Sequence, residues 1–272
     1  MPDAPLPLLY TKSGAIATFT LNRPAARNAL TPELVCRLAD ALRDFVEDPA
    51  LRVGILTGAG DRAFCSGGAR GTMLPLISGD RPATDDWDHR VLEEPFVMAA
   101  SSLRDFPIDK PLIAAINGAC MAGGMEMVLG TDIRIAADHA VFALPEVRRG
   151  VIPFAGSLVR LARQIPHAVA MELLLTGEAV TAVQAQRFGL VNHVVPAGDV
   201  MPQALALAQK IAANGPVAVE AVKRTVRDTS VLALDGAYAL ENDAKRVVMA
   251  SDDAREGPRA FMEKREPRFL GR

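Results

Sequence analysis

Residues 110–138 read KPLIAAINGACMAGGMEMVLGTDIRIAAD, and this stretch decides the fold. The part from 111 to 130 is apolar and long enough to span a membrane, but it contains Asn117, Glu126 and four glycines. A buried strand over PLIAAING, followed by a buried helix near Gly123, explains the pattern without placing a carboxylate in lipid. A continuous apolar strand of this kind is typical of a sheet that is covered on both faces.

Further strands and a well-marked helix flank this stretch. RVGILTG, from Arg52, is a second continuous apolar strand, and IRIAAD and AVFALPE supply two more candidates. Residues 8–24, LLYTKSGAIATFTLNRP, contain two short strand-type runs around a glycine turn. Thr31 can cap a helix in which Pro32 takes the first position, and Asp48 and the proline after it end that helix.

Strand signals disappear after about Val200. MPQALALAQKIAANG is an amphipathic helix that ends at Asn214-Gly215, and further helices follow as far as DDAREGPRAFMEKREP. We therefore predict an α/β core over residues 1–200 and an all-helical region over residues 201–272.

The pattern weakens between Gly71 and Asp109, where charges cluster in GDRPATDDWDHR. This composition indicates a mobile loop with some helix. Such a loop lies either near the functional site or over it, or on the surface as a tolerated insertion. Both interpretations remain open from the sequence.

Composition excludes several classes of function. The chain has 272 residues, half of them hydrophobic, and a net charge of −2, so it lacks the basic surplus that nucleic acid requires. Cys36, Cys65 and Cys120 form no CxxC pair, which argues for a reducing compartment and against disulfides or a zinc site. MPDAPLPLLY shows no signal-peptide pattern, so we expect a cytoplasmic protein. From the apolar stretch and the cysteines discussed above, we expect no membrane segment and no metal.

Two glycine turns follow the two best strands. The first contains Ser66-Gly67-Gly68 and the second contains Gly123-Gly124. Glycine permits sharp turns and leaves backbone amides open to a ligand, and the amides at a helix start suit a developing oxyanion. Taken singly, either turn is more simply an ordinary tight turn.

Two carboxylates strengthen the interpretation of these turns as a site. Glu126 lies in an apolar helix start, where burial raises the pKa of a carboxyl toward the range useful for acid/base catalysis. The alternative is a structural glutamate bonded to backbone. Glu146, in ALPEVRRG, follows a strand and alone would be typical of a surface position. Two carboxylates beside oxyanion-stabilising amides are what proton addition and removal next to a carbonyl require.

Other candidate sites are weaker. GAGDRA, residues 58–63, formally fits a dinucleotide-binding fingerprint, but FCSGGARG follows where a long helix should begin. Ser66 lacks the GxSxG elbow of a nucleophile, and the histidines show no metal-ligand spacing.

The motifs in order resemble a known family. FCSGGA, KPLIAAINGACMAGGMEMVLGTDIRIAAD and FALPEVRRGVIP are similar to segments of the crotonase (enoyl-CoA hydratase/isomerase) family. The resemblance extends from LNRPAARNAL to FMEKREPRF. It implies a spiral of ββα turns with a C-terminal helical part that assembles trimers, commonly paired into hexamers.

The resemblance also implies a site. The oxyanion amides map onto Gly68 and Gly123, and the two catalytic glutamates onto Glu126 and Glu146. The glutamates would hold a water that adds across the 2,3-double bond of an enoyl-CoA. Glu126 would act mainly as the base on that water, and Glu146 would deliver the proton to the α-carbon.

Coenzyme A enters as part of the substrate, so no separate cofactor is implied. The family binds it near the segment that matches AARNAL, which makes Arg27 and Ala29 candidates, and near the loop of Ser66 and Gly68. A Phe/Lys pair in the last helix of a neighbouring subunit also contributes, and Phe261 and Lys264 fit that pair. Arg27 and Lys264 could equally be solvated surface charges.

The sequence departs from the family pattern at three places. Ala69 replaces the usual aspartate and Arg70 follows it; Phe154 begins Phe-Ala-Gly-Ser where many hydratases are glycine-rich; and Met125 precedes the first glutamate. The leading hypothesis is an enoyl-CoA hydratase that takes part in acyl-CoA degradation. The alternatives are a Δ3-Δ2 enoyl-CoA isomerase, a specialised hydroxyacyl-CoA dehydratase, or a non-catalytic or RNA-binding relative.

Overall fold

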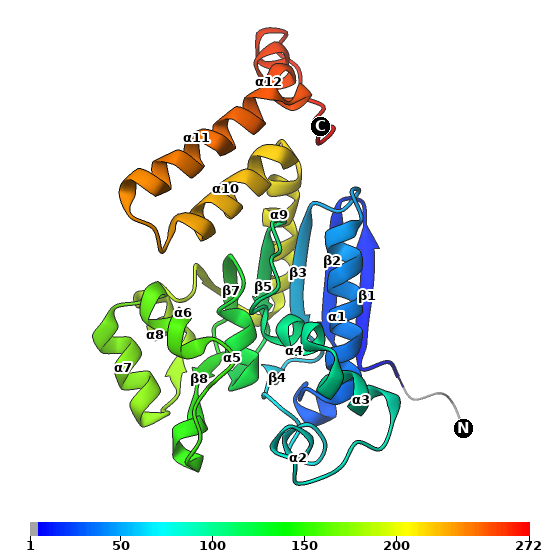
Figure 1. Ribbon diagram of the computed structural model, residues 1–272, viewed down its shortest axis with the longest axis vertical. Coiled ribbons are helices and arrows are strands. Elements are labelled where there is room, and N and C mark those ends of the chain that lie inside the picture. Colours follow the sequence, from blue (N-terminus) through cyan, green and yellow to red (C-terminus); the bar gives the residue numbers. More distant parts are fainter. Residues whose placement is uncertain (1–4) are drawn as a thin grey trace.

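In residues 5–272, the part of the chain that the computed structural model describes, the strands form two β-sheets (Figure 1). The first sheet has the order β1 (Leu8–Ser13), β2 (Ile16–Leu21), β3 (Val53–Gly58), β5 (Leu112–Ile116), β7 (Ile133–Ala137) and β10 (His193–Val195). The second has the order β4 (Ala63–Cys65), β6 (Ala119–Met121), β8 (Val141–Ala143) and β9 (Val180–Thr181). Neighbouring strands are parallel except in the pairs β1–β2 and β8–β9.

Successive strands alternate between the two sheets. β3, β5 and β7 belong to the first sheet, and the strands that follow them, β4, β6 and β8, belong to the second. One or more helices follow each strand pair, so the chain advances as a spiral of ββα turns. This arrangement, with helices at the C-terminal end, confirms the predicted fold class. β4 and β6 were not anticipated, because each has only three residues beside a glycine turn.

Helix α1 (Pro32–Glu47) begins and ends where the sequence predicts. The Thr31 hydroxyl accepts a hydrogen bond from Leu34 N at 3.3 Å, which caps the helix start. The apolar face of α1 packs on the first sheet, where Phe45 meets Phe19 edge to face with ring centroids 5.7 Å apart.

Segment 71–109 is more helical than expected. It contains α2 (Met73–Ser78), α3 (Asp86–Glu93) and α4 (Pro95–Ser102). The charges that suggested a loop are used to build α3: the Asp85 side chain accepts from Asp88 N at 2.9 Å and caps the helix. Asp88 is itself buried and accepts two hydrogen bonds from Arg81, at 2.5 and 2.6 Å. The remaining core helices are α5 (Gly123–Val128), α6 (Ser157–Gln164), α7 (His167–Thr176) and α8 (Ala182–Arg187).

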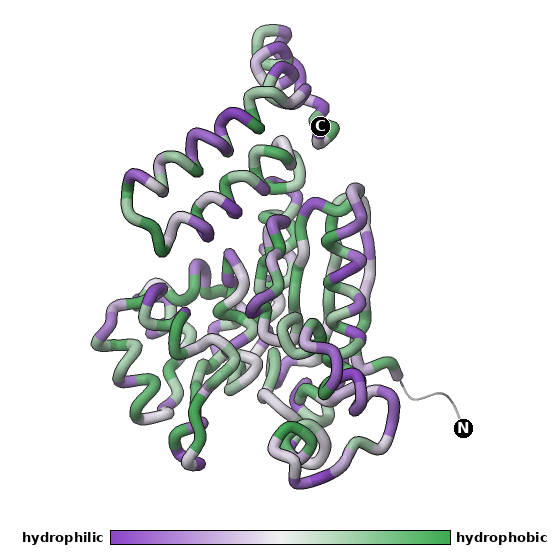
Figure 2. The backbone as a smooth tube through the Cα atoms, in the orientation of Figure 1, coloured by the Kyte–Doolittle hydropathy of each residue, from purple (hydrophilic) through white to green (hydrophobic). Residues whose placement is uncertain are grey.

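The C-terminal part consists of α9 (Val200–Ala212), α10 (Pro216–Thr229), α11 (Leu234–Ala250) and α12 (Asp252–Met262). In Figure 1, α9 lies against the first sheet, whereas α11 and α12 extend away from the core. α11 buries none of its side chains, and along its tube in Figure 2 green apolar residues alternate with purple polar ones. Arg52 links this part to the core by donating to the carbonyls of Ala212 and Phe269, at 2.9 and 2.7 Å. Among the described residues, no helix is long and apolar enough to cross a membrane.

The three cysteines are free and buried. Cys65 on β4 lies opposite Cys120 on β6 in a parallel register, and neither side chain is exposed to solvent. Burial raises the pKa of the Cys65 thiol to about 12 and that of Cys120 well above its ordinary value. Both thiols are therefore protonated and unreactive in the folded chain.

Replacing Gly54 tests how closely the layers pack. A Cβ at this position would lie 2.5 Å from Leu112 Cδ2 and 3.2 Å from the Phe19 ring. We expect Gly54→Ala to lower the free energy of unfolding by about 1–3 kcal/mol in urea titrations, because the core cannot accept a methyl group without rearrangement. Gly198→Ala is the control, since its Cβ would meet nothing within 4 Å, and equal effects of the two changes would contradict the argument.

Candidate active site

The first glycine turn is fixed by Leu30. Leu30 N donates to Gly67 O at 2.9 Å, and Ala69 N donates to Leu30 O at 2.8 Å. These two bonds form a parallel bridge between Leu30 and Gly68. In such a bridge the N–H of the central residue faces the opposite side, so the Gly68 amide is directed away from Leu30. Gly68 borders a cavity.

The second glycine turn brings Gly123 beside the first. Gly123 begins α5, as predicted, and Ala122 before it has φ 50° and ψ −127°, an unfavourable conformation for a residue with a side chain. Ala122 N donates to Ala143 O at 2.9 Å, which anchors the turn to β8. A Cβ added to Gly123 would lie 3.9 Å from Gly68 N. The two amides are therefore neighbours, and in residues 5–272 neither donates to a backbone carbonyl of a turn or loop.

Glu126 lies one turn into α5 and is buried. Its Oε1 accepts hydrogen bonds from Ala155 N at 2.7 Å and from the Ser157 hydroxyl at 3.4 Å. Burial, opposed by the bond from Ala155 and reinforced by the charge of Glu146, raises the pKa of Glu126 to about 7. A carboxyl with this pKa exchanges its proton near neutral pH, as a general base must.

Glu146 lies in the 3-10 helix η2 (Pro145–Arg149), directly after β8. Its Oε2 atom is buried and accepts no hydrogen bond from the described residues. Burial raises the pKa of Glu146, and the charge of Arg149 partly opposes this increase. A buried acceptor without a protein partner is costly, and at a cavity wall it is available to a ligand.

The two glycine amides and the two carboxylates line one cavity of about 310 Å³. Of the predicted site residues, the lining contains Arg27, Ser66, Gly68, Gly123, Glu126 and Glu146. Helices α2 and α4 contribute an apolar wall that includes Met73, Leu74, Ile77 and Met98. Segment 71–109 therefore lies at the site, which was one of the two interpretations of its sequence.

The remaining predicted residues lie elsewhere in the chain. Ala29 does not line the cavity, and its carbonyl accepts a hydrogen bond from Arg23 at 2.8 Å. Phe261 is 82% exposed near the end of α12, and Lys264 follows that helix, so neither reaches the cavity of its own chain. The role expected for this pair from a neighbouring subunit stays a prediction.

Sequence reasoning missed three residues that support the site. Ala155 and Ser157 hold the Glu126 carboxylate, although the sequence drew attention only to the bulk of Phe154 in the same loop. Asn28 is fully buried with φ 54°, and its amide donates to Ala63 O at 2.8 Å, which ties the Arg27 loop to β4. Asparagine tolerates left-handed backbone, so its presence in AARNAL was the available signal.

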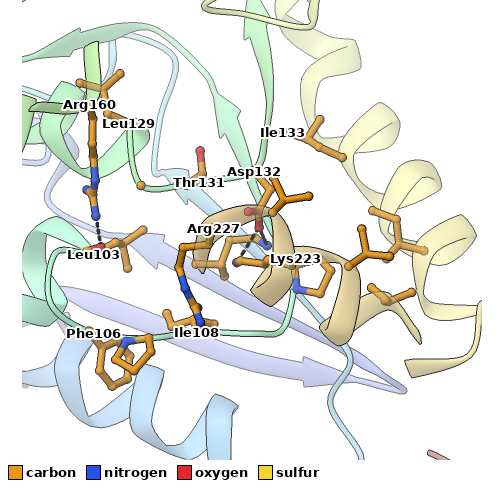
Figure 3. A pocket seen from close by; sticks show the side chains of 18 of the residues that line it. Leu103, Phe106, Ile108, Leu129, Thr131, Asp132, Ile133, Arg160, Lys223 and Arg227 are labelled. Atoms are coloured by element: carbon orange, nitrogen blue, oxygen red, sulfur yellow. Dashed lines mark hydrogen bonds and ion pairs between the residues drawn. The ribbon is translucent and has the colours of Figure 1, made fainter. Parts of the chain in front are cut away.

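Figure 3 shows a second, larger cavity of about 680 Å³, between the core and helices α9 and α10. Several of its charged side chains are already engaged: Lys223 Nζ lies 2.7 Å from Asp132 Oδ2, and Arg160 donates to the Leu103 carbonyl. None of the predicted site residues lines it. The smaller cavity, with its facing amides and carboxylates, is therefore the candidate active site. Within residues 5–272, no cluster of three or more His, Cys, Asp or Glu side chains could hold a metal ion.

A ββα spiral that brings two backbone amides together at one cavity defines the crotonase class of proteins, and here the buried Glu126 and the half-buried Glu146 line that cavity. The chain belongs to the enoyl-CoA hydratase/isomerase family, whose model matches residues 11–272. The predicted family, and with it an enzyme of the acyl-CoA lyase type, is confirmed.

Particular relatives match almost the whole chain. Enoyl-CoA hydratase EchA19 of Mycobacterium tuberculosis is 42% identical over 271 residues, which cover 100% of this chain and 97% of the relative. Carnitinyl-CoA dehydratase of Proteus mirabilis is 38% identical over 269 residues, with 97% and 98% covered. The crystal structure of an enoyl-CoA hydratase from Mycobacterium tuberculosis H37Rv is similar with a TM-score of 0.87 and 37% identity, over 98% of this chain and 100% of that chain.

Replacing Glu126 tests the cost of its burial. Because its pKa is raised from 4.5 to about 7, the folded state binds more protons than the unfolded state in that window, and stability falls as the pH rises through it. We expect Glu126→Gln to be more stable than the wild type at pH 8, by up to about 3 kcal/mol, with no difference below about pH 4.5.

Thermal unfolding across this pH range measures the difference. Glu241→Gln, at an exposed position on α11, is the matched control and should show no such dependence. A Glu126→Gln variant that is less stable than the wild type at pH 8 would show that the charged form is favoured by its surroundings.

Proposed function

We propose that this protein is an enoyl-CoA hydratase that adds water across the 2,3-double bond of a trans-2-enoyl-CoA. The observation that carries the proposal is the presence of both Glu126 and Glu146 in the cavity that also contains the Gly68 and Gly123 amides. The family match and the name of the EchA19 relative support it.

The two amides would stabilise the thioester oxygen as negative charge develops on it. When water attacks C3 of the enoyl group, the π electrons move toward C2 and the thioester oxygen, which becomes enolate-like. Two fixed N–H donors stabilise that charge without reorganising during the reaction. The Leu30 bridge and the start of α5 hold them in place before substrate arrives.

The two carboxylates would move the protons. Glu126 in its ionised form accepts a proton from water, whose oxygen bonds to C3. Glu146 in its protonated form delivers a proton to C2, and the enolate electrons form the new C–H bond. Transfer of the proton from Glu126 back to Glu146 through solvent completes the cycle. The pKa of Glu126, raised to about 7, is consistent with proton exchange close to neutral pH, and burial raises the pKa of Glu146 as well.

The same pair of residues can catalyse the reverse reaction. Dehydration of a 3-hydroxyacyl-CoA uses Glu146 to remove the C2 proton and Glu126 to protonate the departing hydroxide. The carnitinyl-CoA dehydratase relatives, such as the one from Proteus mirabilis at 38% identity, support this second candidate direction. Isomerisation of a Δ3 double bond needs only one base, so the presence of both carboxylates favours hydration or dehydration over isomerisation.

Coenzyme A would enter along the Arg27 loop as part of the substrate. Arg27 and Ser66 line the same cavity, and Ser66 N donates to Arg27 O at 3.1 Å, so the loop and the first glycine turn form one wall. The guanidinium of Arg27 supplies positive charge for the nucleotide phosphates.

Loss of the conjugated enoyl-thioester absorbance with crotonyl-CoA and longer 2-enoyl-CoAs tests the proposal. We expect Glu126→Gln and Glu146→Gln each to lower kcat by at least about 100-fold while acyl-CoA binding is retained, because each removes one proton-transfer group. Glu178→Gln, at an exposed position, is the control. Absence of turnover on every 2-enoyl-CoA, with binding retained, would overturn hydration, and near-normal turnover of a 3-enoyl-CoA by Glu146→Gln would favour isomerisation.

We also propose a homotrimer, which can pair into a hexamer. The support comes from exposed apolar side chains on elements that bury little in one chain: Phe261 and Met262 are 82% and 79% exposed, and Val247 and Met249 of α11 are also exposed. Such surfaces are typical of protein interfaces. Association would bring Phe261 and Lys264 to the cavity of a neighbouring chain.

Light scattering and kinetics test this assembly together. We expect a mass of three or six chains, each 28.9 kDa, and a KM for enoyl-CoA raised about tenfold in Lys264→Ala, because one charge–phosphate contact is lost. Lys210→Ala, at an exposed position of α9, should leave KM unchanged. A monomeric mass with normal activity would contradict the shared site.

A further inference from the structure

The cavity of the candidate active site carries unpaired positive charge close to its carboxylates. Arg70 and Arg149 line it together with Glu126 and Glu146, whereas Arg27, the third arginine of the lining, is the one proposed to face the nucleotide phosphates. In the described part of the chain, neither arginine forms an ion pair, whereas Arg148, next to Arg149, lies 3.9 Å from the carboxylate of Glu178. Glu146 and Arg149 are three positions apart in the 3-10 helix η2, so their side chains leave the same face of that helix, and both line the cavity.

The rest of the lining offers nothing that would hold a cation. Apart from the two glutamates, the cavity lining of the described chain contains no carboxylate, and Phe154 is its sole aromatic residue. A quaternary ammonium group is recognised by carboxylates or by several aromatic faces around it. Apart from Arg27, Ser66, Ser101 and Ser102, aliphatic and thioether side chains form the remaining walls, including Ile77, Met98 and Ile152.

We propose that this cavity selects uncharged aliphatic acyl groups, that it rejects acyl groups carrying a quaternary ammonium, and that Arg70 and Arg149 determine this selection. The proposal rests on the proposed function only for the position of the acyl group in this cavity. It separates this chain from relatives named for carnitinyl-CoA, whose acyl group carries a trimethylammonium.

The position of the arginines favours rejection of cations over recognition of anions. Both side chains belong to exposed residues, so each is solvated and does not form a buried pocket for a carboxylate. A solvated arginine needs no partner, but its field still opposes a second positive charge brought into the same cavity. The uncharged walls then take an acyl chain by burial of apolar surface.

A pair of isosteric ligands isolates charge from shape. 4-(Trimethylammonio)butanoyl-CoA and 5,5-dimethylhexanoyl-CoA differ by nitrogen in place of carbon, and neither has a double bond to hydrate. We expect the wild type to bind the uncharged ligand more tightly by on the order of 30-fold in calorimetry, the factor that one unit charge within about 8 Å gives at an effective dielectric constant of about 20. Equal affinities, or tighter binding of the cation, would overturn the proposal.

Substitution of Arg70 and Arg149 tests whether these two residues cause the preference for the uncharged ligand. In the double variant Arg70→Gln/Arg149→Gln we expect the ratio of the two dissociation constants to fall by about tenfold, mainly through tighter binding of the cation. Arg148→Gln, with a side chain outside the cavity, should leave the ratio unchanged. A ratio that persists in the double variant would overturn the role of the arginines.

Turnover of the corresponding 2-enoyl-CoAs separates this proposal from the proposed function. If the uncharged enoyl-CoA is not hydrated, hydration fails, but the ratio of dissociation constants still decides the selection. If the cationic enoyl-CoA is hydrated as efficiently as the uncharged one, the selection fails while hydration stands.

Discussion

Helix α5 lies so close to strand β4 that only glycine fits between them. A Cβ on Gly124 would lie 2.6 Å from both the Cβ and the carbonyl oxygen of Cys65, distances that side chains do not adopt. The close approach brings the amide of Gly123 beside that of Gly68 and directs Glu126 into the cavity. A larger residue at this position would push α5 away from β4, and the two amides and the carboxylate would then separate together.

Glu126 needs both burial and hydrogen-bond donors, which are opposite requirements on the residues around it. Burial must be deep enough to raise the pKa of Glu126, yet a buried carboxylate needs hydrogen-bond donors to be stable in its charged form. The loop after η2 meets both demands, because Ala155 N donates to Glu126 while Arg104 holds the carbonyl of Phe154 at 3.1 Å. Among residues 5–272, Glu146 has no such donor on Oε2, so the two carboxylates differ in how strongly their charged forms are supported.

Much of this arrangement could be predicted from residue patterns. The apolar strands, the cap at Thr31 and the helices after Val200 follow from local rules, and the structure confirms them. The motif spacing also brought Glu126 and Glu146 into one hypothesis. The features that could not be predicted depend on tertiary contacts. Strands β4 and β6 are stabilised by pairing rather than by their own three residues. Every residue except proline has a backbone amide, so the sequence does not show that the amide of Ala155 binds Glu126.

In segment 71–109 too, a tertiary contact produces structure that the local sequence pattern did not predict. Its charges indicated a loop because charged clusters generally lie in solvent, but here Arg81 and Asp88 neutralise each other inside the fold. Arg81 precedes α3 and Asp88 lies within it, so no helical period connects the two residues in the sequence. The resulting helices bring Met73 and Met98 to the cavity, so a region without a clear pattern supplies the apolar wall.

The buried thiols under the two glycine turns have a consequence for dynamics. Cys65 and Cys120 lie on the strands that lead into Gly68 and Gly123, and both are fully shielded. A thiol reagent can modify them only while β4 and β6 are open, so the labelling rate follows the free energy of that local opening and not the intrinsic reactivity of the cysteines. The protein thus contains an intrinsic chemical probe for transient disassembly of its own catalytic scaffold.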